Sequence, residues 1–256
     1  MTRIGTAALV AMAMLLLWQA VVSIWSLPPY ILPGPMVVLT TLIDEWSLIG
    51  EHALTTMLEI VLGLLLGTAW GLLSALLMAR SRRMHRWMMP ALVISQALPV
   101  FALAPILVLW LGYGIASKVA MAFLIIYFPV TAACYDGLSR TNPGWIELAR
   151  SLRANNWMIL TRVRFPAALP AIASGLRIAT SVAPIGAVVG EWVGSSRGLG
   201  YLMLHANGRM QVDLMFAALL VLAVFTVTLY FTVDALLAKL LHWQPRTIGT
   251  VVTGGG

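Results

Sequence analysis

The residues best suited to chemistry in this sequence are ionisable side chains inside long apolar stretches. Glu59 lies roughly two helical turns into one such stretch, and Arg177 lies roughly three turns into another. A bare charge at the centre of a bilayer costs about 2.5–3.5 kcal/mol on insertion scales, so both residues are candidates for substrate contact or gating. Each also has a structural interpretation: Glu59 as an interior carboxylate that is hydrogen-bonded or wetted by a cavity, and Arg177 as one half of an ion pair. Asp136 and Asp234 lie nearer the ends of their stretches, where reaching the interface costs less.

Other chemistries lack the residues that they require. Residues 194–200 are rich in glycine, but no Gly-Lys-Ser/Thr ending follows, so they cannot hold phosphates as a P-loop does. His-Glu-x-x-His and Gly-x-Ser-x-Gly are both absent, and the 4 histidines are scattered along the chain. The single Cys134 allows neither an internal disulfide nor a cysteine-based metal site. We therefore expect no catalytic residue, no metal site and no cofactor bound to this chain.

The composition indicates an all-α membrane protein. Of its 256 residues, 61% are hydrophobic and 10% are charged, and the mean hydropathy is +0.93. Soluble domains carry about 25% charged residues, so this chain has too few to cover a soluble surface, and it is too apolar to be disordered. We predict one transmembrane domain over residues 1–249, a cytoplasmic loop at 139–165 and a disordered tail at 250–256. The six predicted spans cover approximately residues 5–27, 52–79, 87–112, 116–138, 166–189 and 214–241.

Lysine and arginine gather on one side of this predicted topology. All but three of the 16 lie at the N-terminus, after the second and fourth spans, at the inner end of the fifth span or at the C-terminus. The exceptions are Lys118, Arg197 and Arg209. By the positive-inside rule, both termini and the long loop are cytoplasmic. The net charge of +7 therefore reports orientation in a lipid bilayer, and we expect no nucleic-acid partner.

Two patterns within the spans concern how the helices are arranged. Gly63, Gly67 and Gly71 recur every four residues, which gives the second span a face of small residues for close helix packing. Prolines within the spans bend helices and free carbonyl groups that other protein or a water-filled cavity must satisfy. These bends suit a transport path better than an inert anchor. The prolines concerned are Pro99, Pro105, Pro129, Pro170 and Pro184.

The loop between the fourth and fifth spans predicts two short helices. Asn142 could cap the first, with Pro143 at its first position and Glu147 in the early turns. Asn155 and Asn156 end that helix, and a second one leads to the next span. A basic, partly apolar helix pair below the membrane could dock on a partner protein, or it could be an amphipathic loop that lies on anionic lipid.

This loop resembles the EAA loop of importer-type ABC transporter permeases. The family pattern is Glu-Ala-Ala, three residues, Gly, nine residues, then Ile-x-Leu-Pro. Glu147-Leu148-Ala149 takes the place of the first triplet, and Val163-Arg164-Phe165-Pro166 takes the place of the end, with the nine-residue spacing kept. The sequence departs from the pattern at Leu148, which replaces Ala, and at Arg153, which replaces the Gly between the two helices.

The resemblance extends over most of the chain. Residues 27–35, 95–99 and 166–189 look like the nitrate, sulfonate and taurine branch of these permeases. Residues 190–194 and 201–207 look most like members assigned to pyrimidine precursors of thiamine. The resemblance implies an importer permease with six spans in the bacterial inner membrane, for which a thiamine-precursor pyrimidine is the leading substrate and sulfonate, taurine or nitrate are alternatives. An ion-driven secondary transporter with Glu59 as proton carrier is a more distant alternative.

The resemblance also implies partners and roles for particular residues. The permease would act as a homodimer with a dimer of separate ATPase subunits, which bind ATP and Mg²⁺, and with a periplasmic or lipid-anchored binding protein. The residues implied for coupling to the ATPase are Glu147, Ala149, Arg150, Ser151, Arg153, Ala154 and Trp157. The candidates for the translocation path are Glu59, Gln96, Pro99, Arg177 and Glu191.

Overall fold

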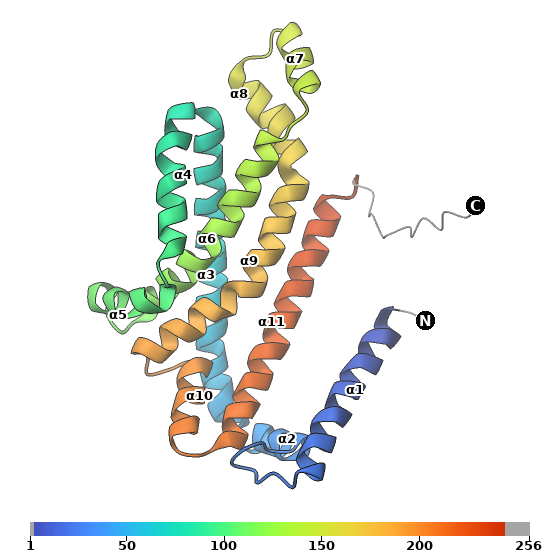
Figure 1. Ribbon diagram of the computed structural model, residues 1–256, viewed down its shortest axis with the longest axis vertical. Helices are drawn as coiled ribbons and strands as arrows, with labels where there is room; N and C mark the ends of the chain where they lie inside the picture. The colour runs from blue at the N-terminus through green and yellow to red at the C-terminus, as the bar shows by residue number, and fades with distance from the viewer. Residues whose placement is uncertain (1–2, 244–256) are drawn as a thin grey trace, which may run out of the picture.

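The computed structural model describes residues 3–243, and all regular structure within them is helical (Figure 1). The predicted disordered tail at 250–256 lies outside these residues. The helices pack side by side as an elongated bundle. They are α1 (Arg3–Ile24), α2 (Pro35–Asp44), α3 (Trp46–Arg80), α4 (Arg82–Ala97), α5 (Val100–Leu111), α6 (Ile115–Ser139), α7 (Pro143–Ser151), α8 (Asn156–Ile159), the π-helix η1 (Leu160–Arg164), α9 (Phe165–Gly194), α10 (Leu199–Gly208) and α11 (Val212–Leu240).

Four of the described helices are long and apolar enough to cross a membrane. These are α3, α6, α11 and the continuous helix formed by α8, η1 and α9. The pair α4 and α5 makes a fifth span if the two count as one, and the apolar part of α1 is the shorter stretch Met12–Ile24. The all-α membrane architecture is thereby confirmed. The count of six spans and the side on which the two termini lie stay predictions.

The segment predicted as one span at 87–112 is a bent pair of helices. α4 ends at Ala97, α5 begins at Val100, and the two are inclined by 99°. Pro99 has no N–H to donate, and its ring holds Leu98 in an extended conformation with φ −78° and ψ 123°. The helix cannot continue through these two residues, and α5 turns away from the bundle (Figure 1). The pair is a broken span or a re-entrant loop.

The centre of the bundle is α6, whose contacts with α3 and with α9 are the most extensive between described helices. Glycines on α3 lie directly against it. A Cβ atom at Gly63 would lie 2.4 Å from the Ala122 Cβ, one at Gly67 would lie 2.6 Å from the Ile126 Cγ2, and one at Gly71 would lie 2.9 Å from a Val130 side-chain carbon. The backbones of α3 and α6 approach so closely at these three positions that no residue larger than glycine fits there.

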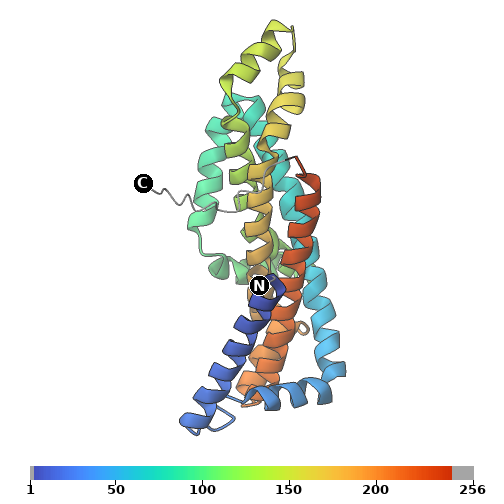
Figure 2. The same cartoon turned by 90° about the vertical axis from the view of Figure 1, so that its right-hand side faces the viewer.

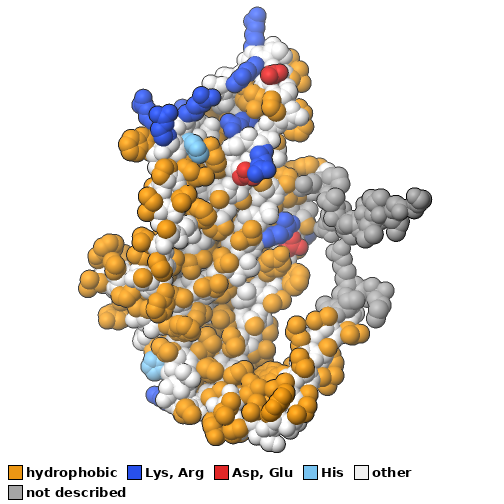
Figure 3. All heavy atoms as spheres, viewed as in Figure 1, with side chains coloured by type: hydrophobic (Ala, Val, Ile, Leu, Met, Phe, Trp, Pro, Cys, Tyr) orange, Lys and Arg blue, Asp and Glu red, His pale blue; other side chains and the backbone are white. Residues whose placement is uncertain are grey.

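Basic side chains gather at one end of the bundle, around α7, α8 and the start of α4 (Figure 3). By the positive-inside rule we expect this end to be cytoplasmic, and α2 and α10 lie at the opposite, outer end (Figure 1). Figure 2 shows α7 and α8 extending beyond the long helices at the cytoplasmic end. The fold therefore has one helical projection at its basic end and two short helices, α2 and α10, at the other.

Candidate functional site

The cytoplasmic projection consists of two capped helices. Asn142 accepts a hydrogen bond from the Gly144 N–H at 2.9 Å, and Pro143 occupies the first turn of α7. Asn155 accepts one from the Met158 N–H at 2.8 Å and so caps α8. Both asparagines satisfy N–H groups that no helical carbonyl can reach. The predicted start of the first helix is confirmed. The prediction that Asn155 and Asn156 end it is wrong: α7 ends at Ser151, and the two asparagines begin α8.

The turn between α7 and α8 is a Schellman motif. The Ala154 N–H donates to the Ala149 carbonyl at 2.9 Å, and the Arg153 N–H donates to the Arg150 carbonyl at 2.9 Å. This motif requires a left-handed residue after the helix, and Arg153 has φ +60°. Arg153 is also the residue that replaces the Gly of the EAA pattern. The bend is therefore kept without the glycine, in a conformation that disfavours a side chain.

The surface of α7 is open to solvent. Within the described chain, no residue of α7 is buried, and Leu148 and Leu152 are 61% and 75% exposed. Trp157 on α8 is also exposed, with the Arg80 guanidinium 5.9 Å from its ring centre. Apolar side chains among charged neighbours on a projecting helix are typical of a protein-binding surface. Of the residues implied for coupling, Glu147, Arg150, Ser151, Arg153 and Trp157 are exposed, and Ala149 and Ala154 are half-buried.

One arginine fixes the base of this projection to the bundle. Arg164, at the end of η1, donates from Nε to the Leu138 carbonyl at 2.9 Å and from Nη1 to the Ala79 carbonyl at 3.3 Å. These carbonyls lie in the last turns of α6 and α3, where no helical N–H is available to them. A cation also suits the negative end of a helix dipole. The two short helices are thus joined to three of the long ones.

A buried polar cluster occupies the opposite end of the same long helices. Glu191 on α9 is 1% exposed, and it accepts from the Thr56 hydroxyl at 2.6 Å and from the Gly200 N–H at 2.5 Å. Thr56 on α3 in turn accepts from the Leu199 N–H at 2.7 Å. The carboxylate therefore caps the start of α10 and ties that helix to α3 and α9. A negative charge at a helix N-terminus is favourable because it opposes the helix dipole.

The turn before α10 depends on a glycine. Gly198 has φ +115°, and a Cβ atom there would lie 2.2 Å from the Glu191 carboxylate. Its N–H donates to the His52 Nδ1 at 2.9 Å. A side chain at this position would meet both a disfavoured backbone conformation and the buried acid. The outer helix is therefore held by an arrangement that only glycine allows.

Two further charged side chains complete this cluster. Glu59 on α3 is 1% exposed, and its Oε2 has no hydrogen-bond partner among the described residues. It lies three residues after Thr56 on α3, and therefore on the helix face that meets Glu191. Lys118 on α6 is 2% exposed and donates to the carbonyls of Tyr113 and Gly114. Charges are rarely buried unless they are paired, and this group brings two carboxylates and one ammonium together at the junction of three helices.

The structure brings together only two of the five candidate path residues, Glu59 and Glu191. Arg177 pairs with Asp234 on α11, with 2.6 Å between Nε and Oδ1. Gln96 and Pro99 lie at the bend between α4 and α5, where Gln96 Nε2 donates to the Leu124 carbonyl at 3.3 Å.

Sequence reasoning missed three members of the buried cluster: Thr56, Lys118 and His52. The signal for Lys118 was present, because it is the only lysine close to the start of a strongly apolar stretch. The sequence predicts Lys118 at the outer end of the span 116–138, only as an exception to the charge bias, whereas it is buried on α6. Thr56 carries no comparable signal, because a threonine within a membrane helix commonly bonds only to its own backbone.

Comparison with known proteins identifies the family. Residues 67–242 match the family described as binding-protein-dependent transport system inner membrane component. A "Probable ABC transporter permease protein" of Haemophilus influenzae is 59% identical over 90% of this chain and 94% of its own length. The "Formylaminopyrimidine transport permease protein ThiX" of Halalkalibacterium halodurans is 39% identical over 85% of this chain and 88% of its own. The "Riboflavin transport system permease protein RibX" of Chloroflexus aurantiacus is 36% identical over 91% and 88%.

The fold agrees with this assignment. A chain from a structure titled for inward-facing conformations of the MetNI methionine ABC transporter superposes with a TM-score of 0.67. The superposition covers 77% of this chain and 97% of that one at 18% identity, so it shows the fold alone. The sequence match, the shared fold and the apolar spans agree with one another. This chain belongs to the binding-protein-dependent ABC transporter permeases, and it is a multi-pass permease subunit of the bacterial inner membrane.

Proposed function

We propose that two copies of this chain form the translocation path of an ATP-driven importer for a pyrimidine precursor of thiamine. Each copy inserts α7 into a separate ATPase subunit, and those subunits bind ATP and Mg²⁺. A separate binding protein delivers substrate to the outer end. Closure of the ATPase pair moves the two α7 helices together and switches the spans between inward-open and outward-open states. The permease needs two states of similar free energy, which ATP and the loaded binding protein bias differently.

The observation that carries the coupling role is the exposed α7 surface. A helix of nine residues with no buried side chain gains little from its own bundle, and its apolar residues gain from a partner. Its position at the cytoplasmic end agrees with the side on which ATP is available. The capped start and the Schellman turn fix the orientation of α7. A displacement of α7 is therefore transmitted to α8 and is not absorbed by a flexible loop.

The substrate proposal rests on the relative whose printed name refers to a formylaminopyrimidine, together with the outer segments 190–194 and 201–207. A riboflavin permease is nearly as similar, so riboflavin belongs in the test beside taurine, sulfonate and nitrate. These compounds differ enough that one binding protein would not carry them all. The substrate is the compound that, once loaded on the binding protein, stimulates ATP hydrolysis by the transporter.

The test is ATP hydrolysis and uptake by the permease reconstituted with its ATPase and binding protein. Formylaminopyrimidine or hydroxymethylpyrimidine on the binding protein should stimulate hydrolysis and be taken up, whereas riboflavin and taurine should do neither. If only another compound stimulates hydrolysis, the protein is still an importer, but the proposed substrate is wrong. Failure of the chain to copurify with any ATPase would remove the importer proposal itself.

The coupling role is tested separately by Glu147→Lys, which reverses a charge on the exposed α7 surface. We expect uptake and substrate-stimulated hydrolysis to fall while the chain still inserts into the membrane. The matched control is Asp136→Asn, which changes a carboxylate at the same end that pairs with Arg140 at 2.7 Å and lies outside α7. Equal uptake by the wild type and by Glu147→Lys would contradict the docking of α7.

The buried acids are the specific reason to keep an ion-driven transporter as a second candidate. Glu59 and Glu191 are adjacent carboxylates in a protein interior, which is an arrangement that proton-coupled transporters use. In proteoliposomes without nucleotide, an imposed proton gradient would drive uptake by such a transporter, and Glu59→Gln would abolish it. An importer of the proposed kind would show no uptake under those conditions.

A further inference from the structure

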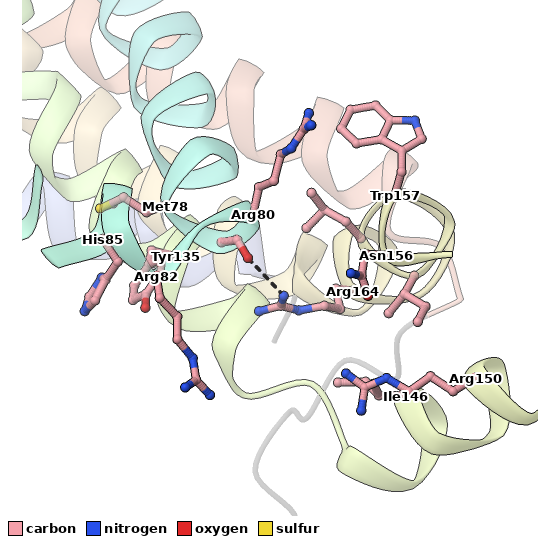
Figure 4. A pocket seen from close by; sticks show the side chains of 13 residues that line it. Met78, Arg80, Arg82, His85, Tyr135, Ile146, Arg150, Asn156, Trp157 and Arg164 are labelled. Carbon is pink, nitrogen blue, oxygen red and sulfur yellow. Dashed lines mark hydrogen bonds between the residues drawn. The ribbon is translucent and has the colours of Figure 1, made fainter. Parts of the chain in front are cut away.

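A cavity at the cytoplasmic membrane surface is lined by cationic side chains. It has a volume of about 800 Å³ and lies between the ends of α3 and α6, the start of α4 and the helices α7, α8 and η1 (Figure 4). Sites for small molecules occupy roughly 300–1,000 Å³. The cavity is therefore large enough for a ligand and is not a packing defect. Its lining comprises Met78, Ala79, Arg80, Arg82, His85, Tyr135, Ile146, Arg150, Asn156, Trp157, Ile159, Leu160 and Arg164.

The charge of this lining is positive. It contains four arginines and a histidine, and no Asp or Glu among the described residues contributes to it. Arg80, Arg82 and Arg150 form no ion pair within residues 3–243, and Arg164 donates only to backbone carbonyls. Figure 4 shows Arg82 and Arg150 on opposite sides of the cavity with Arg164 between them. Like charges that line one cavity repel one another, and an anion bound among them would offset that repulsion.

A histidine adds a polar group that lacks a partner. The Nδ1 atom of His85 is buried and has no hydrogen-bond partner among the described residues. The ring is held in place by stacking on Tyr135, with 4.7 Å between ring centres. Because this nitrogen atom is not accessible, a ligand in the cavity would meet other atoms of the ring, and the arginines carry the argument for an anion.

The level of the cavity in the membrane narrows the choice of anion. Met78 and Tyr135 belong to the last turns of α3 and α6, where the apolar parts of those helices end. The apolar sequence of α3 gives way here to Arg80, Arg82 and Arg83, a basic boundary of the kind expected beside the headgroups of the cytoplasmic leaflet, where basic pockets between helices bind anionic lipids. Ile146, Ile159 and Leu160 add apolar surface beside the cations. Guanidinium groups also suit phosphate, because they donate two parallel hydrogen bonds to its oxygens.

We propose that this cavity binds a phosphate-bearing anion, the headgroup of an anionic phospholipid, which bridges Arg82 at the membrane surface and Arg150 on α7. The bound phosphate neutralises cations that form no ion pair with a carboxylate of residues 3–243. It also joins the coupling helix to the ends of α3 and α4 through contacts that the protein alone does not make. A soluble phosphate compound would satisfy the same chemistry, so the experiment separates the two sources.

The test uses the delipidated full-length chain in a neutral detergent, titrated with phosphatidylglycerol, phosphatidylcholine or inorganic phosphate and observed by native mass spectrometry. Phosphatidylglycerol should bind as a discrete adduct and phosphatidylcholine should not. Arg82→Gln should weaken binding by about tenfold, the usual effect of losing one charge-assisted contact. Arg82→Lys keeps the charge but loses the pair of parallel hydrogen bonds, so it should weaken phosphatidylglycerol binding less.

Arg83→Gln is the matched control, because it removes the same charge from the neighbouring residue, which does not line the cavity. Arg83→Gln should bind phosphatidylglycerol as the wild type does. Equal losses in Arg82→Gln and Arg83→Gln would show a diffuse basic surface and overturn the proposal. Discrete binding of inorganic phosphate that Arg82→Gln abolishes, without binding of phosphatidylglycerol, would keep the site and assign it to a soluble phosphate. The lipid-binding test does not depend on the proposed substrate, because it measures binding and not transport.

Discussion

Arg153→Gly should stabilise the turn between α7 and α8. Arg153 has φ +60°, and a left-handed conformation costs a residue with a side chain about 1–2 kcal/mol. Glycine avoids that cost but loses about 0.5–1 kcal/mol more conformational entropy on ordering. The net gain is then about 0.5–1 kcal/mol, which corresponds to a roughly two- to fivefold slower local opening. The Ala154 and Arg153 N–H groups, which close the turn, report that opening directly.

Amide hydrogen exchange of the purified full chain measures this effect, because α7 buries no side chain and opens without the rest of the bundle. Arg153→Ala is the essential comparison: it removes the same side chain but keeps the left-handed Cβ, so the difference between Gly and Ala isolates the backbone. Exchange at residues 153 and 154 should be two- to fivefold slower in Gly than in Ala, within the range of the roughly 1 kcal/mol penalty. Leu152→Gly, where φ is −83°, should instead speed exchange.

The chain offers a second site for the same reasoning. α10 also ends in a Schellman motif, with Met210 at φ +59° and the Gln211 N–H donating to the Ala206 carbonyl at 2.9 Å. Met210→Gly should therefore slow exchange at Gln211 by a similar factor. Equal protection in the Gly and Ala variants at both positions would refute the claim that these turns carry left-handed strain.

Three further changes test the packing and the buried charges, each by thermal unfolding of the purified chain. Gly63→Ala should destabilise it by about 1–3 kcal/mol through overpacking against α6, whereas Gly50→Ala, with nothing within 4 Å, should be neutral or slightly stabilising. Glu191→Ala should cost about 2–4 kcal/mol because it leaves buried donors without an acceptor, and Glu191→Gln should cost less. Asp234→Ala should cost about 1–3 kcal/mol, because it leaves the Arg177 guanidinium without its partner inside an apolar span; a loss well below that would show that water screens the pair.

The start of α7 was predictable because it depends on near neighbours in sequence. Asn142 and Pro143 specify a helix start by their own geometry. Asn155, predicted as part of the end of that helix, instead caps α8, and asparagine favours both roles, so its type alone does not separate them. The glycine spacing on α3 likewise predicts a close helix contact, although it does not name α6 as the partner. Each of these features depends on the sequence of a single helix and its ends.

The outer cluster could not be predicted in the same way. Thr56 and Glu191 are separated by 135 residues, and their contact depends on how three helices and a turn are arranged together. The burial of Lys118 depends on the same arrangement, since its own helix begins only three residues earlier. The bend at Pro99 was foreseeable as an interruption, but its 99° angle depends on the packing around it.

One helix connects the two ends of the molecule. α8, η1 and α9 form a continuous apolar helix of 39 residues, from Asn156 beside the coupling turn to Gly194 beside the outer cluster. Arg164 fixes its cytoplasmic part to α3 and α6, and Glu191 fixes its outer part to α10. A rigid displacement of α8 by a docked partner therefore cannot leave the Glu191 cap undisturbed unless the helix bends. The π-helical turn at 160–164, Pro170 and Pro184 are where such a bend would be absorbed, because each already lacks regular helical hydrogen bonds.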